Sequence, residues 1–237
     1  MNTQRVAIIT AASRGIGAGC ARELAARGYK VALIARNKSI FDLAEALGGI
    51  AIQGSIANAE DLQQLVETAL NRFGRIDAVV NNFGDPPRPD LLSISDDMWR
   101  ENFEMLFLSV VRMARLITEP MRQQGGGAIV NISACDSREP ELGTPFSGTL
   151  RAAMEGFTKL YAKRYRADKI RMNSVAPFFV ADSMEELVGW NVPTDLMHGR
   201  PATYIELAKT VAFLISDDAK FISGTTLKVD EAYSAAI

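Results

Sequence analysis

The sequence predicts an α/β fold in which a doubly wound parallel sheet of about seven strands carries helices on both faces. Apolar strands alternate with amphipathic helices along the chain, and several strands are continuously apolar, as expected when both sheet faces are covered. Nearly half of the 237 residues are apolar, which is enough for one large core. No linker, repeat or low-complexity tract divides the chain, so we expect a single domain over residues 1–237.

The expected elements follow one another in repeated strand–helix units. Strands are predicted at residues 5–10, 30–35, 50–54, 78–81, 128–133, 170–175 and 225–229. Helices are predicted at residues 15–27, 41–47, 59–73, 96–123, 149–165 and 204–215, the fourth of them capped by Ser95.

Two loops are longer than usual. Residues 85–90 are stiffened by prolines, and residues 178–202 leave the carboxyl end of a strand, where ligands bind in doubly wound sheets. The sequence predicts a substrate lid at 178–202, with a packed surface or a subunit contact as the other interpretation. His198 lies in this segment, either as an acid or as a surface residue.

Composition excludes several classes of protein. A net charge of -2 argues against nucleic acid or an anionic membrane as partner, and no apolar run is long enough to span a bilayer. One histidine and two cysteines are too few for a zinc site, so we expect no metal. The sequence contains no G-x-S-x-G motif, which argues against a hydrolase. The chain has no signal-like segment and is expected in the cytoplasm, with Cys20 and Cys135 as free thiols.

The turn after the first strand has the pattern of a phosphate-binding loop. Residues 10–17 read Thr-Ala-Ala-Ser-Arg-Gly-Ile-Gly and open the first helix. Glycines there permit a tight turn and let helix N–H groups approach a pyrophosphate. With a strand before it and a helix after it, the pattern predicts dinucleotide binding.

This turn resembles the Thr-Gly-x-x-x-Gly-x-Gly pattern of the short-chain dehydrogenase/reductase family, with Ala11 as a mild departure from the first glycine. Residues 81–84, 173–177 and 223–230 resemble three further motifs of that family, in order. The resemblance implies a Rossmann-type fold, a nicotinamide cofactor and a small-molecule substrate. It places the cofactor against Thr10, Ser13, Arg14, Gly15, Ile16, Gly17, Arg36, Ser55, Ile56, Asn82, Gly84, Arg151 and Pro177.

Arg36 ends the second strand, where a carboxylate would favour NAD, and Arg14 adds charge on the same side. An arginine pairs with the 2′-phosphate of NADP, so NADP(H) is favoured over NAD(H); a solvated basic turn is the other interpretation. Four residues depart from the family's cofactor site, namely Phe83, Ser55, Phe178 and Asp182.

The family's four catalytic positions are all changed. The resemblance assigns a serine, a tyrosine and a lysine to Ala134, Ser147 and Arg151. The intervals support this, because Ala134 to Ser147 is thirteen residues and Arg151 to Pro177 is twenty-six. Counting from Trp99 places Leu106 at the fourth position, the family's asparagine.

Two lookalikes are rejected. Tyr165 and Lys169 form a Tyr-x-x-x-Lys at the far end of the helix, too late in the chain. Ser133 lies one residue from Ala134, and a shift of one residue along a strand turns a side chain to the opposite face.

Ser147 and Arg151 share a helix face, and Asp136 extends from the preceding strand end toward the ligand side, as does Cys135. Ser147, Arg151 and Asp136 are the candidate catalytic group, and a structural salt bridge between Asp136 and Arg151 is the other interpretation.

The sequence leaves three functions open. They are an NADP(H)-dependent oxidoreductase of altered mechanism, a non-redox isomerase, dehydratase or cyclase, and a non-catalytic nucleotide-binding subunit. The resemblance also implies a homotetramer or homodimer packed through the helices at 96–123 and 149–165. Apolar positions of these helices are compatible with that packing or with the core: Phe103, Leu106, Met113, Phe157 and Tyr161.

Overall fold

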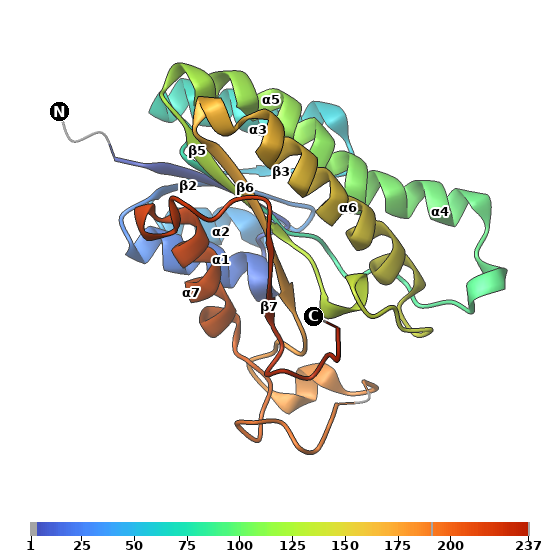
Figure 1. Ribbon diagram of the computed structural model, residues 1–237. Coiled ribbons are helices and arrows are strands. Elements are labelled where there is room, and N and C mark those ends of the chain that lie inside the picture. The colour runs from blue at the N-terminus through green and yellow to red at the C-terminus, as the bar shows by residue number, and fades with distance from the viewer. Residues whose placement is uncertain (1–3, 191, 237) are drawn as a thin grey trace.

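The computed structural model describes residues 4–190 and 192–236 and confirms the predicted α/β architecture there (Figure 1). Within these residues, parallel strands form one seven-stranded sheet in the order β3-β2-β1-β4-β5-β6-β7. The strand order reverses beside β1, between β1 and β4. In a doubly wound sheet, ligands bind outside the carboxyl ends of the strands at such a reversal.

The strands are β1 (Val6–Thr10), β2 (Lys30–Ala35), β3 (Ile50–Gln53), β4 (Ala78–Asn81), β5 (Gly127–Ile132), β6 (Ile170–Pro177) and β7 (Thr226–Val229). The α-helices are α1 (Gly15–Ala26), α2 (Ser39–Ala46), α3 (Ala59–Phe73), α4 (Asp96–Phe103), α5 (Ser109–Gln123), α6 (Pro145–Arg164) and α7 (Tyr204–Ile215). Three short turns matter for the site: η2 (Glu104–Leu108), η3 (Cys135–Ser137) and η5 (Met184–Leu187). All seven predicted strands are present, each with ends within two residues of the prediction.

The sheet separates two apolar cores because neighbouring strand residues point to opposite faces. Ala7 and Ile9 of β1 pack with α1, α2 and α7, whereas Ile8 between them packs with α3, α5 and α6. Figure 1 shows the same division, with α1, α2 and α7 on one side of the sheet and α3, α5 and α6 on the other. The continuously apolar strands are therefore explained by two buried faces.

One predicted helix is wrong in detail. Residues 96–123 form α4 and α5 joined by the π-helical turn η2, rather than one regular helix. Apolar periodicity detects a helix but does not detect a local widening of its turns. The predicted cap is confirmed, because Ser95 Oγ accepts the Met98 N–H at 3.2 Å.

Helix α6 begins four residues before the predicted start, at Pro145. Proline fits the first helical position because its missing N–H is unpaired there in any helix. The early start brings Ser147 into the first turn of α6, at the edge of the sheet where β5 ends.

Candidate active site

The turn between β1 and α1 is held to β4 by a reciprocal pair of hydrogen bonds. Thr10 Oγ1 donates to the Asn82 carbonyl at 2.7 Å and accepts the Asn82 N–H at 2.8 Å. The Asn82 side chain donates to the Ala11 carbonyl at 3.1 Å. Both side chains, predicted as cofactor contacts, thus shape the turn itself.

Ala11 is strained in this turn. Its φ is +47°, in the left-handed region that costs a residue with a Cβ about 1–2 kcal/mol. The substitution of the family's first glycine is therefore not as mild as the sequence suggests. Gly17 is required for another reason, since a Cβ there would lie 2.6 Å from the Ala11 carbonyl oxygen and 2.7 Å from Asn82 Nδ2.

The remaining predicted cofactor residues spread along the carboxyl edge of the sheet. Among them, Arg14 and Arg36 are exposed, Ser13, Gly15, Ile16, Ser55 and Gly84 are half-buried, and Ile56 and Pro177 are buried. The Ser55 N–H donates to Asp61 Oδ2 at 2.7 Å, which places the Asp61 carboxylate of α3 beside Ser55.

Asp136, Ser147 and Arg151 are brought together as one hydrogen-bonded chain. Ser147 Oγ donates to Asp136 Oδ1 at 3.1 Å and accepts the Arg151 Nε–H at 3.0 Å. No ion pair joins Asp136 to Arg151 within the described residues. The predicted alternative, a direct salt bridge, is replaced by a link through the serine hydroxyl.

Arg151 is buried and fixed. Its Nη1 donates to the carbonyls of Ile132 and Ser133, the latter at 3.1 Å, and only 7% of the residue is exposed. Burial lowers the pKa of the guanidinium from its usual value, and the charge of Asp136 opposes that shift. The Phe83 ring, with its centroid 5.4 Å from Arg151 Cζ, compensates part of the charge. Nη2 has no hydrogen-bond partner within residues 4–190 and 192–236, which leaves donors for a ligand.

Glu155 stabilises the turn that holds Asp136, and the sequence analysis did not identify it. It lies one turn after Arg151 on the same face of α6, with 8% exposure. Its carboxylate accepts from Ser133 Oγ at 2.6 Å, from Ser137 Oγ at 2.5 Å and from Arg138 Nε at 2.6 Å. It thereby anchors η3, the turn that carries Asp136. The i, i+4, i+8 spacing from Ser147 was a signal that could have found it.

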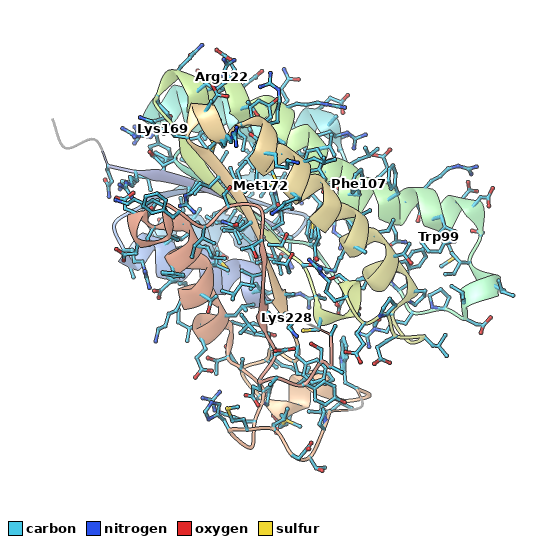
Figure 2. The ribbon with its side chains drawn as sticks, in the orientation of Figure 1. Trp99, Phe107, Arg122, Lys169, Met172 and Lys228 are labelled. Atoms are coloured by element: carbon cyan, nitrogen blue, oxygen red, sulfur yellow. The ribbon has the colours of Figure 1, made fainter. Side chains whose placement is uncertain are left out.

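The two lookalikes do not belong to this group. Tyr165 caps the end of α6, and the Lys169 carbonyl accepts from Gly127 at the start of β5. Asp168, the neighbour of Lys169 in the chain, pairs with Arg122 of α5 at 2.9 Å. Figure 2 labels Lys169 and Arg122 in the upper part of the molecule and Lys228 lower down. Ser133 is bound to Glu155. Leu106, at the expected asparagine position, is fully buried in the core within η2.

Aromatic rings line the described part of the segment 178–202; residue 191 lies outside the described residues. Phe178 stacks on Tyr233 of the C-terminal segment with centroids 4.0 Å apart and contacts Phe179 at 4.3 Å. Phe179 contacts Trp190 at 5.7 Å. The Arg88 guanidinium from the proline-rich loop lies 3.2 Å from the Trp190 ring centroid. The two long loops therefore meet at Arg88 and Trp190, a contact that the sequence did not indicate.

A cavity of about 460 Å³ lies between this segment and the end of β7. Phe178, Phe179, Lys228 and Asp230 are among its lining residues, and so is the exposed His198. None of Asp136, Ser147 and Arg151 lines it, so His198 is not brought to the catalytic candidates.

Both thiols are free, as predicted, and both are buried. Cys135 Sγ donates to the Ala176 carbonyl at 3.4 Å, so this thiol faces β6 rather than Ser147. In the described part of the chain, no group of three or more His, Cys, Asp or Glu residues is placed to hold a metal ion, and no helix is long and apolar enough to cross a membrane.

Comparison with known proteins identifies the family of this chain. The family model described as enoyl-(acyl carrier protein) reductase matches residues 10–234. A 3-oxoacyl-[acyl-carrier-protein] reductase of Synechocystis is 34% identical over 240 residues, covering 96% of both chains. Dehydrogenase/reductase SDR family member 4 of Caenorhabditis elegans is 31% identical over 238 residues, covering 93% of this chain and 91% of its own.

Solved structures of relatives have the same fold. L-Sorbose reductase from Gluconobacter frateurii, complexed with NADPH and L-sorbose, superposes with a TM-score of 0.89 at 28% identity and covers 99% of this chain and 98% of its own. Acetoin dehydrogenase from Enterobacter cloacae gives 0.88 at 28% identity, with 100% and 98% coverage. The chain belongs to the short-chain dehydrogenase/reductase family, and these relatives are oxidoreductases.

Proposed function

We propose that the protein is an NADP(H)-dependent oxidoreductase with an altered active site, acting on a small carbonyl, hydroxyl or conjugated substrate. The observation that carries the proposal is the Asp136–Ser147–Arg151 chain of hydrogen bonds, in which a serine hydroxyl lies between an acid and a buried cation. In the alignment that we propose, Ser147 and Arg151 stand at the positions of the family's tyrosine and lysine, near the nucleotide turn.

The residues present fit a nicotinamide dinucleotide. The start of α1 has no side-chain cap, which leaves its amide end for a pyrophosphate. The unpartnered Nη2 of Arg151 supplies donors for ribose hydroxyls. The exposed Arg14 and Arg36 supply charge for a 2′-phosphate, which supports NADP(H) over NAD(H). When bound, the nicotinamide supplies or accepts a hydride.

Proton transfer is assigned to Asp136 and Ser147. Ser147 Oγ accepts from Arg151 and donates to Asp136, so its own proton is already directed at the carboxylate. In oxidation of an alcohol, the substrate proton enters Ser147 Oγ while the serine proton passes to Asp136. Asp136 is half-buried and exchanges that proton with water. In reduction the same steps run in reverse.

The arrangement makes ordinary ketone chemistry slow. An aliphatic hydroxyl is far less acidic than a tyrosine phenol with its pKa of about 10. Loss of a well-matched general acid costs about 10²–10⁴-fold in rate. The Arg151 charge next to Ser147 Oγ offsets part of this loss by stabilising negative charge on that oxygen.

Fluorescence titration of the purified protein with NADPH and NADH tests the cofactor assignment. We expect NADPH to bind more tightly than NADH. If neither NADPH nor NADH binds, the redox function is excluded, and the non-redox enzyme and the non-catalytic subunit remain. Turnover against a panel of carbonyl compounds then separates the oxidoreductase from those two. The combined Ala134→Ser, Ser147→Tyr and Arg151→Lys variant is expected to gain activity on simple ketones. No gain in a folded, NADPH-bound variant would contradict the alignment of these positions.

We also propose a cytoplasmic homodimer or homotetramer in which one domain carries the lid at 178–202. The helices α4–α5 and α6 remain the proposed interface, although Leu106, Met113 and Tyr161 are core residues. Phe103 keeps 38% exposure and Phe157 is half-buried, so they are the apolar positions from the predicted set that are left for a partner. Sedimentation of wild type and Phe103→Asp tests this, and identical masses would count against the interface.

A further inference from the structure

Tyr204, the first residue of α7, lies directly over the nucleotide turn. A Cβ built on Gly15 would be 3.6 Å from Tyr204 Cε1 and 3.9 Å from its hydroxyl oxygen. One built on Gly19 would be 2.9 Å from the Tyr204 carbonyl oxygen, so α7 packs tightly on α1 at this point. The phenol is therefore held at the helix end where a pyrophosphate would bind.

Two lid carboxylates bind this one residue. The Tyr204 hydroxyl donates to Glu186 Oε2, and the Tyr204 N–H donates to Asp182 Oδ1 at 3.1 Å. Glu186 belongs to η5 and is exposed, as is Asp182. The lid is thus fastened to the nucleotide turn by the tyrosine, while Trp190 fastens it to Arg88 on the other side.

The Tyr204 hydroxyl lies between Gly15 and the Glu186 carboxylate, so the hydrogen bond to Glu186 brings a negative charge close to Gly15. The N-terminus of a helix attracts anions, and a dinucleotide pyrophosphate carries two negative charges to the same place. Like charges at such separations repel, so the carboxylate and the pyrophosphate compete for the positive end of α1.

We propose that Glu186 and Tyr204 form a latch over the nucleotide turn, which opens when a dinucleotide binds and thereby couples lid position to cofactor occupancy. This inference rests on the proposed function in requiring a dinucleotide at the turn. It adds that the Glu186 carboxylate and the pyrophosphate of the cofactor exclude each other from the start of α1.

Three single substitutions separate the charge, the hydroxyl and the general effect of an altered lid. Glu186→Gln removes the charge and keeps a hydrogen-bond acceptor. Tyr204→Phe removes the hydroxyl and keeps the ring over Gly15. Glu185→Gln is the matched control, because Glu185 is an exposed neighbour in the same turn with no contact to Tyr204 in the described structure.

Affinity for NADPH is measured by isothermal titration calorimetry at low and high salt. Two unit charges about 6 Å apart at an effective dielectric near 40 correspond to roughly a tenfold change in Kd. Glu186→Gln and Tyr204→Phe are expected to tighten binding by about that factor at low salt, with a smaller gain at high salt. Glu185→Gln is expected to match wild type.

A second readout follows the lid without turnover. In a Trp99→Phe background, Trp190 is the remaining tryptophan of the chain and reports on lid contacts. We expect Tyr204→Phe to increase acrylamide quenching of Trp190 in the free protein, and NADPH to increase it in the parent.

The results distinguish the two levels of inference. If wild type binds NADPH and all three variants bind it equally, the latch is refuted and the proposed function stands. If binding tightens equally in Glu185→Gln, general lid charge rather than the Tyr204 contact is responsible, and the latch is also refuted. If neither wild type nor any of the three variants binds NADPH, the proposed function is refuted, and the latch, which depends on it, is refuted as well.

Discussion

Replacing Ala11 by glycine should stabilise the protein, although the substitution removes a methyl group. The φ of +47° costs a residue with a Cβ about 1–2 kcal/mol. Glycine also makes the unfolded chain more flexible, which lowers the free energy of unfolding by about 0.5–1 kcal/mol and offsets part of the relieved strain. The net expectation is a stabilisation of about 0.5–1 kcal/mol, or a rise in Tm of about 2 °C for a chain of this size.

Urea unfolding followed by circular dichroism measures this change in the cofactor-free protein. Ala18→Gly is the matched control, because Ala18 lies inside α1 and is half-buried like Ala11. The control is expected to lose about 1 kcal/mol, since glycine in a helix interior is unfavourable. If Ala11→Gly loses stability by a similar amount, the left-handed strain at Ala11 is refuted.

Three further predictions concern the proton path, the cofactor and the thiols. Asp136→Asn is expected to lower kcat about 10²-fold and leave NADPH affinity unchanged, whereas an equal loss of both would show that Asp136 only maintains the fold. Arg36→Asp is expected to weaken NADPH more than tenfold relative to NADH, as measured by paired titrations; an unchanged ratio would remove Arg36 from the 2′-phosphate site. Burial raises the pKa of Cys20 from 9.0 to about 12, so the folded thiol keeps its proton while the unfolded one ionises. The contribution of Cys20 to the free energy of unfolding is then full below about pH 9 and falls as pH rises toward 12. Urea midpoints of wild type and Cys20→Ala, measured at pH 8, 9 and 10, should therefore differ less as the pH rises.

Local patterns identified most of the fold. The strand at 30–35 and the helices at 59–73 and 204–215 were predicted with the same ends as β2, α3 and α7. These elements have unambiguous apolar periodicity or clear boundary residues, such as the Asn58 cap of α3. The π-helical turn at Glu104–Leu108 was missed, because it changes hydrogen bonding without changing which residues are apolar.

The candidate site was found in part. The family resemblance, supported by the spacing, pointed to Ser147 and Arg151 on one helix face and to Asp136 at the neighbouring strand end. The direction of their hydrogen bonds and the burial of Arg151 depend on contacts between β5, η3 and α6, which sequence spacing does not contain. Glu155 was missed although its spacing from Ser147 was a signal, and Tyr204 was missed because its contacts with Glu186 and Gly15 join segments distant in the chain.

The sequence by itself determined the doubly wound sheet, and it predicted the nucleotide turn and the positions at which the family's proton-handling residues are changed. Each of these is encoded within one element or by a fixed interval along the chain. Only the tertiary structure decided that Ser147 bridges Asp136 to Arg151 and that Glu186 meets Tyr204 over Gly15. Those contacts join segments brought together by packing, and packing is a property of the whole core rather than of any local pattern.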